Sequence, residues 1–106
     1  MKFRGGMAEL MKQANRLQRK IEKRKKELEE ETVEAAAGNE QVKAVVNCGG
    51  ELVSVTIDPA LLESEGLEMV QDLVVAATNA ALKKAQETVD AEVEKVTGGL
   101  KIPGMM

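Results

Sequence analysis

An unbroken heptad pattern near the N-terminus constrains the fold of this chain more than any other feature. Apolar residues recur at alternating spacings of three and four, with Arg24 in the one polar position; the apolar series is Met7, Leu10, Ala14, Leu17, Ile21 and Leu28. Such spacing places these side chains on one face of an α-helix, and no Pro or Gly interrupts it. We therefore predict a helix from about residue 6 to about residue 30, roughly 37 Å long.

After Thr32 the spacing changes from helical to alternating. Two turn signals, Gly38-Asn39 and residues 47–50 (NCGG), separate three short apolar segments. Alternation divided by glycine-containing turns is typical of a three-stranded antiparallel meander. The residues expected to share one face are Val33, Ala35 and Ala37, then Val42, Ala44 and Val46, then Val53, Val55 and Ile57, with Leu52, Ser54 and Thr56 on the opposite face.

A second long helical pattern fills the C-terminal third. Asp58 and Pro59 can start a short helical turn as cap and first residue, and Ser64 and Gly66 mark a break. Apolar spacings of three and four then predict a helix from about residue 66 to about residue 97, roughly 48 Å long, which ends at Gly98-Gly99. The fold class is α+β in the order α-β-β-β-α, with residues 1–99 as one domain and 100–106 as a flexible tail.

The two helices are too long for the rest of the chain to cover. A sheet of such short strands is only about 20 Å tall, so the apolar stripes of both helices extend beyond it. The chain has 43% hydrophobic residues but one aromatic residue, Phe3, and a core of small aliphatic side chains buries little area per residue. We therefore expect an obligate homodimer, in which a second copy covers the stripes.

The sequence gives little support for a catalytic function. There is no His, and the single cysteine, Cys48, lies in a predicted turn without a His partner. The two Gly-Gly pairs lack the spacing of a phosphate-binding loop. Acidic residues near the predicted helix starts could supply oxygen ligands, but the simpler interpretation is that they favour the positive end of the helix dipole; these are Asp58, Glu63, Glu65, Glu68 and Asp72. We expect no enzyme, no cofactor, no metal site and no small-molecule substrate.

The sequence also indicates the compartment. One cysteine cannot form an internal disulfide, which fits a reducing environment. Lys2 and Arg4 are not followed by the apolar segment of a secretory signal, and no apolar run reaches the roughly 20 residues needed to cross a membrane. We expect a cytoplasmic protein without membrane contact.

Charge is distributed unevenly along the chain. The net charge is −3, but residues 1–30 carry ten Lys and Arg against five Glu, a net of +5, and the other 76 residues carry five against 13 acidic residues, a net of −8. The cations of the first helix form a strip beside the apolar face, where they can neutralise successive phosphates. Arg16, Arg19, Lys20 and Lys23 lie along this strip, with Lys12 and Lys26 at its ends, and Arg24 and Lys25 complete the basic cluster.

Two interpretations of this cluster stay open. With hardly any aromatic residues for stacking on single strands, a polyanion partner is expected to be duplex DNA held by its backbone. Alternatively, Glu and Lys four residues apart, such as Glu22 and Lys26, merely keep a long helix soluble. In that case the helix serves assembly, and the chain is a protein-protein interaction module.

Three segments resemble the YbaB/EbfC family of bacterial nucleoid-associated proteins. They are GGMAELMKQANRLQRKIEK, AAAGNEQVKAVVNCGGELVSVTIDPALL and DLVVAATNAALKKAQE, in that order from about Gly6 to Gly99. The resemblance implies a dimer whose long helices protrude like the arms of tweezers, DNA binding, a place in the nucleoid, and a role in organising the chromosome and modulating gene expression.

The resemblance also implies where DNA binds. In related proteins the protruding helices carry the DNA contacts, with Lys83 and Lys84 here as weaker candidates. The resemblance thus implies seven candidate DNA-binding cations on the first helix, which are Lys12, Arg16, Arg19, Lys20, Lys23, Arg24 and Lys26. The second long helix departs from a DNA-binding surface because it carries Glu87, Asp90, Glu92 and Glu94. These carboxylates repel phosphate, so contacts are expected mainly on the first helix.

Overall fold

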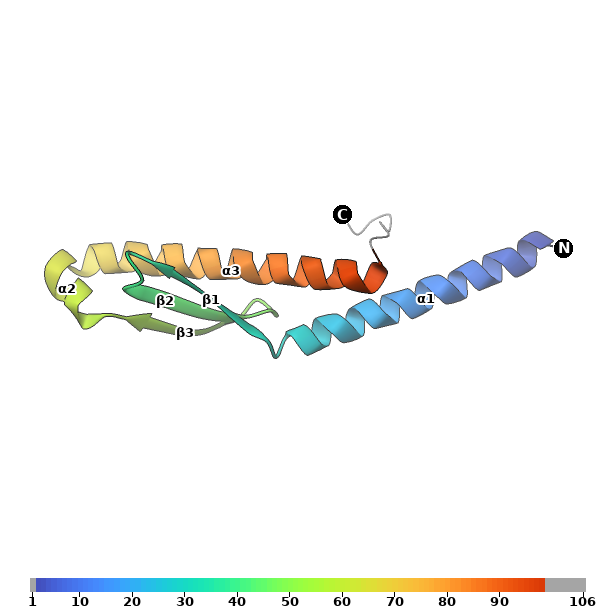
Figure 1. Cartoon of the computed structure of the whole chain (residues 1–106), viewed down its shortest axis with the longest axis horizontal. Helices are drawn as coiled ribbons and strands as arrows, with labels where there is room; N and C mark the ends of the chain where they lie inside the picture. The colour runs from blue at the N-terminus through green and yellow to red at the C-terminus, as the bar shows by residue number, and fades with distance from the viewer. Residues whose placement is uncertain (1, 99–106) are drawn as a thin grey trace.

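The computed structural model describes residues 2–98, with side chains from residue 6 onward, and its elements follow the predicted order (Figure 1). It is an elongated molecule of 76 × 21 × 17 Å. The elements are α1 (Lys2–Leu28), β1 (Thr32–Ala37), β2 (Val42–Asn47), β3 (Leu52–Ile57), α2 (Pro59–Glu65) and α3 (Leu67–Thr97). The predicted α+β class is confirmed. The predicted tail at 100–106 lies outside the described residues.

The three strands form one antiparallel sheet in the order β1-β2-β3, which confirms the predicted meander. Val33 pairs with Val46 on one side of β2, and Val42 pairs with Ile57 on the other. On the central strand Val42, Ala44 and Val46 are fully buried, because this face of the sheet packs against α3. The core therefore lies between the sheet and one long helix.

The prediction that side chains alternate strictly between the two faces of the sheet was wrong for the start of β3. Val45 pairs with Ser54, but Val46 pairs with Leu52, so the register shifts by one residue and Val53 has no partner of its own. A β-bulge of this kind sets two residues opposite one and disturbs the alternation of faces. Leu52 and Val53 are accordingly both at least half exposed, on an edge strand that α3 covers little.

The turn between β1 and β2 requires a glycine. Gly38 has a φ of +61°, and Asn39 and Glu40 follow with positive φ as well. A Cβ atom on Gly38 would lie 2.7 Å from Cδ1 of Leu73 on α3. A larger residue at position 38 would therefore be strained by the positive φ and would force the Leu73 side chain to move.

The predicted helix boundaries around residue 58 and residue 98 are confirmed. The Asp58 carboxylate accepts a hydrogen bond of 3.0 Å from the Ala60 N–H, which caps α2 with Pro59 as its first residue. Gly66, at a φ of +85°, separates α2 from α3. Gly98 ends α3 in the left-handed conformation, and its N–H donates to the Lys95 carbonyl oxygen.

The first helix begins and ends slightly earlier than predicted, at Lys2 and Leu28 rather than near residues 6 and 30. Glycine weakens a helix but does not end one, so the Gly5-Gly6 pair lies within α1. The C-terminal part of α1 lies along the last part of α3, while its N-terminal half projects past the end of α3 (Figure 1). We call residues 2–16 the arm; its described side chains, 6–16, are all exposed.

The heptad seam is therefore buried only at one end within this chain. Ile21 and Leu28 are 3% and 0% exposed, whereas Met7 and Leu10 are 62% and 63% exposed. Among residues 6–98, the part of the seam that lies on the arm is uncovered. The structure describes a single chain, so the expected dimer stays a prediction.

Candidate nucleic-acid interface

Six of the seven candidate cations form a continuous exposed surface on α1. We call this surface the α1 strip, and its residues are Lys12, Arg16, Arg19, Lys20, Lys23 and Lys26, all of them exposed. At 100° per residue the middle of the strip lies about 150° around the helix axis from the middle of the apolar seam, whereas Lys20 at the edge of the strip lies about 90° from it. From Lys12 to Lys26 it extends over about 21 Å. A partner that covered the seam would leave the strip accessible.

Within residues 6–98, none of these six cations has a carboxylate within ion-pair distance. Among the side chains of residues 6–98, ion pairs form only at Arg24 and Lys95. The alternative interpretation, in which Glu and Lys four residues apart pair along the helix, is therefore not what the structure shows for Glu22 and Lys26. The charge of the strip is available to an external anion.

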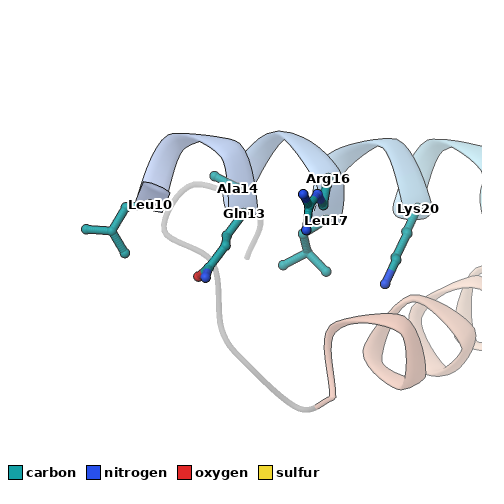
Figure 2. Close-up of a pocket in the computed structure, with 6 residues that line it drawn as sticks. All are labelled: Leu10, Gln13, Ala14, Arg16, Leu17 and Lys20. Atoms are coloured by element: carbon teal, nitrogen blue, oxygen red, sulfur yellow. The ribbon is translucent and has the colours of Figure 1, made fainter. Parts of the chain in front are cut away.

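The edge of the strip adjoins the apolar seam. Arg16 and Lys20 line an open hollow on α1 together with residues of the seam and its flank, namely Leu10, Gln13, Ala14 and Leu17. Figure 2 shows Leu17 and Lys20 pointing to the same side of the helix, the side on which α3 ends. Apolar and cationic groups thus line the same hollow on α1, between residues 10 and 20.

Arg24, the seventh candidate, is turned toward the body of the molecule. Its guanidinium donates to the carboxylate of Glu92 on α3 and lies 3.4 Å from carboxylate oxygens of Glu27 and Glu31. Its side chain is only 29% exposed. The structure therefore separates Arg24 from the strip and places it in the contact between α1 and α3.

The ionisation of this cluster follows from its contacts. Hydrogen bonds from Lys95, at 2.7 Å, and from Arg24 lower the pKa of Glu92 to about 2. The hydrogen bond to Glu92 likewise raises the pKa of Arg24. Both groups are charged at neutral pH, and the two opposite charges compensate each other. The one polar position in the heptad seam was the sequence signal for this contact, but its partner on α3 could not be identified from it.

The weaker candidates on α3 lie apart from the strip. Lys83 and Lys84 are exposed, and the Lys84 ammonium donates to the backbone oxygen of Glu34 on β1 at 3.1 Å. Their neighbours Glu87, Asp90 and Glu94 are exposed carboxylates. This part of α3 offers a mixed, largely acidic surface, as the sequence predicted.

Features of an enzyme or a metal site are sparse. Within residues 2–98, no three His, Cys, Asp or Glu side chains come together in a way that could hold a metal ion. Burial, and to a lesser extent the charge of Glu31, raises the pKa of the half-buried Cys48 thiol, which disfavours the reactive thiolate. None of the helices described is both long enough and apolar enough to span a membrane.

Comparisons with known proteins identify the family of this chain. The model of the YbaB/EbfC DNA-binding family matches residues 3–100. A nucleoid-associated protein of Thermoanaerobacter sp. strain X514 is 46% identical, over 97% of this chain and 95% of its own. A nucleoid-associated protein of Pelotomaculum thermopropionicum is 45% identical, over 95% of this chain and 96% of its own.

The fold also resembles a crystal structure of an uncharacterized protein from Helicobacter pylori. The TM-score is 0.61 at 23% identity, over 74% of this chain and 92% of the other. The matched family and the names of the relatives indicate a DNA-binding protein and not an enzyme, as the sequence predicted. This chain belongs to the YbaB/EbfC DNA-binding family.

Proposed function

We propose that this protein binds duplex DNA through the phosphate backbone, as a homodimer in the cytoplasmic nucleoid, where it helps to organise the chromosome and regulate genes. One observation carries the proposal: six exposed cations, with no carboxylate partner among the side chains of residues 6–98, follow one side of a projecting helix. Arg24 is left out of the DNA-contacting set because its charge is already compensated by three carboxylates.

The strip has the dimensions of a backbone contact. Successive cations of the strip lie one to four residues apart, or about 1.5 to 6 Å along the helix axis, and phosphates on one DNA strand are spaced about 3.4 Å along the duplex axis. Lys and Arg so arranged neutralise phosphates and release condensed counterions without reading base edges. The expected binding is tolerant of sequence and sensitive to salt.

Exposed apolar side chains support the homodimer. Met7, Leu10 and Met11 on the arm are each more than 60% exposed, and Leu52 and Val53 on the β3 edge are 50% and 56% exposed. Soluble chains avoid contiguous apolar surface of this kind, and a twofold dimer buries the same patch on both copies. Sedimentation velocity at micromolar concentration is expected to give a dimer; a folded monomer would contradict this part of the proposal.

A gel-shift titration of the wild-type protein at two ionic strengths tests DNA binding. We expect retardation of duplexes of unrelated sequence at low salt and a steep loss of affinity at high salt. Salt-independent affinity, or no retardation at low salt, would refute it.

The exposed apolar arm also favours a second candidate, a protein-protein interaction module. That function predicts a stoichiometric protein partner that remains bound after nuclease treatment. Recovery of such a partner by a protein that does not retard duplex DNA would establish the second candidate in place of the first.

A further inference from the structure

The cation that the DNA-binding surface does not use occupies the base of the arm. Arg24 lies between Ile21 and Leu28, the two seam residues of α1 that are buried. We propose that Arg24 is a positioning residue: it holds α1 at a defined angle to α3 through Glu92, and so sets where the α1 strip meets DNA.

The contacts of Arg24 are arranged as a link between two elements. Glu27 and Glu31 approach the guanidinium from α1 itself and from the segment directly after it, at 3.4 Å each. Glu92 approaches it from α3, 68 residues away in sequence. Among the side chains of residues 6–98, this is the only ion pair that joins α1 to α3.

Glu92 is itself held in place. Its side chain is 20% exposed, and its second oxygen accepts from Lys95, one helical turn along α3, at 2.7 Å. Lys95 is 77% exposed, so it orients the carboxylate without being buried. Arg24 therefore meets a carboxylate with a restricted orientation, which gives the contact a preferred direction. The apolar contacts of Ile21 and Leu28 are non-directional and define the angle less sharply.

The arm amplifies any change at its base. Met7 is 17 residues from Arg24, or about 26 Å along the helix. A tilt of about 10° at Arg24 would displace the tip by about 4.5 Å, which exceeds the axial phosphate spacing of about 3.4 Å on one strand. This inference rests on the proposed function, because the angle matters for affinity only when the strips of two copies must engage one duplex together.

Neutralising Glu92 separates positioning from direct DNA contact. Glu92→Gln removes a negative charge and leaves Glu27 and Glu31 as the carboxylate partners of Arg24, with at most a neutral hydrogen bond to the amide oxygen at position 92. A phosphate-binding Arg24 would then be freed, and DNA affinity would rise. For a positioning residue we expect affinity to fall, by about fivefold, although the protein becomes more positive. The matched control is Glu94→Gln, an exposed carboxylate on the same helix, which is expected to leave affinity unchanged or slightly higher.

A double-mutant cycle extends the test. If Arg24 and Glu92 act only through each other, the Arg24→Gln/Glu92→Gln protein is no weaker than either single variant. If Arg24 contacts phosphate, Arg24→Gln weakens binding, Glu92→Gln strengthens it, and the double variant returns toward the wild type. A rise or no change in affinity for Glu92→Gln overturns the proposal.

The arm angle can be followed without DNA. Spin labels at Ala8→Cys and Glu87→Cys in a Cys48→Ala background, diluted with unlabelled protein, report the distance between arm and α3. We expect Glu92→Gln to shift or broaden this distance and Glu94→Gln to leave it unchanged. An unaltered distance for Glu92→Gln overturns the proposal. If wild-type protein fails to bind DNA, the proposed function fails, whereas this distance still decides the role of Arg24.

Discussion

Removing two cations from the middle of the α1 strip gives the most direct test of its function. For backbone contacts the logarithm of the binding constant falls with the logarithm of salt with a slope of about −0.9 per phosphate neutralised. Six strip residues predict a slope of about −5.4 per arm, or an affinity loss of roughly 2,000-fold between 50 and 200 mM salt. Arg16→Ala with Lys20→Ala leaves four contacts and a slope of about −3.6.

The same relation predicts the affinity of this variant. At about 0.1 M salt each lost contact weakens binding about eightfold, so the pair costs about 60-fold, equally for duplexes of unrelated sequence. If both arms of a dimer engage one duplex, the slopes double, but the variant still loses one third of the slope. Gel-shift titrations at four salt concentrations on two unrelated duplexes measure both quantities.

The control removes the same charge elsewhere. Lys25→Ala with Lys43→Ala changes the net charge equally, but Lys25 lies on the seam side of α1 and Lys43 lies on β2. We expect the salt slope of this control to stay close to the wild type, because neither Lys25 nor Lys43 belongs to the surface that neutralises phosphates, and the slope counts the phosphates neutralised. An unchanged slope for Arg16→Ala with Lys20→Ala, an equal loss in the control, or a loss limited to one duplex would refute the reasoning.

Three further predictions concern stability. Leu28→Ala removes a fully buried side chain at the base of α1 and should lower the free energy of unfolding by about 3 kcal/mol in urea titrations, while Leu62→Ala, at a site 49% exposed, should cost less than half as much. Gly38→Ala should destabilise by more than Gly50→Ala, because both positions have positive φ but only the first would place a Cβ against a neighbouring side chain; equal losses would show that the contact does not matter. The pKa of Glu92 is lowered from 4.5 to about 2, so the contribution of this carboxylate to stability is complete above about pH 4.5 and is lost as the pH falls toward 2. The difference in free energy of unfolding between wild type and Glu92→Gln should therefore shrink between pH 6 and pH 3. A constant difference would contradict this prediction.

Local patterns were sufficient to predict most of the elements. The heptad spacing predicted α1, the alternation predicted the strands, and the capping pair Asp58-Pro59 predicted α2, because each depends on residues close together in sequence. The bulge at Leu52 and Val53 was missed. Alternation reports which face a residue prefers, whereas a shift of register depends on the partner strand.

The candidate surface was predictable to a similar extent. A helix of known period places Lys12, Arg16 and Lys23 on one side, so their common surface follows from spacing alone. Spacing could not show that Arg24 leaves this group, because Glu92 lies 68 residues away. The polar position in an apolar seam marked Arg24 as unusual but did not identify its partner.

The amino-acid order by itself determined the two long helices, the meander and the placement of positive charge on the first helix, since periodicity and composition act over a few turns or one hairpin. Only the tertiary structure decided which half of α1 is buried, which of its cations is compensated, and which strand edge is exposed. The physical reason is that burial and ion pairing depend on which segments meet in space. The buried part of α1, around Ile21 and Leu28, packs beside α3, although all three strands of the sheet lie between these two helices in sequence.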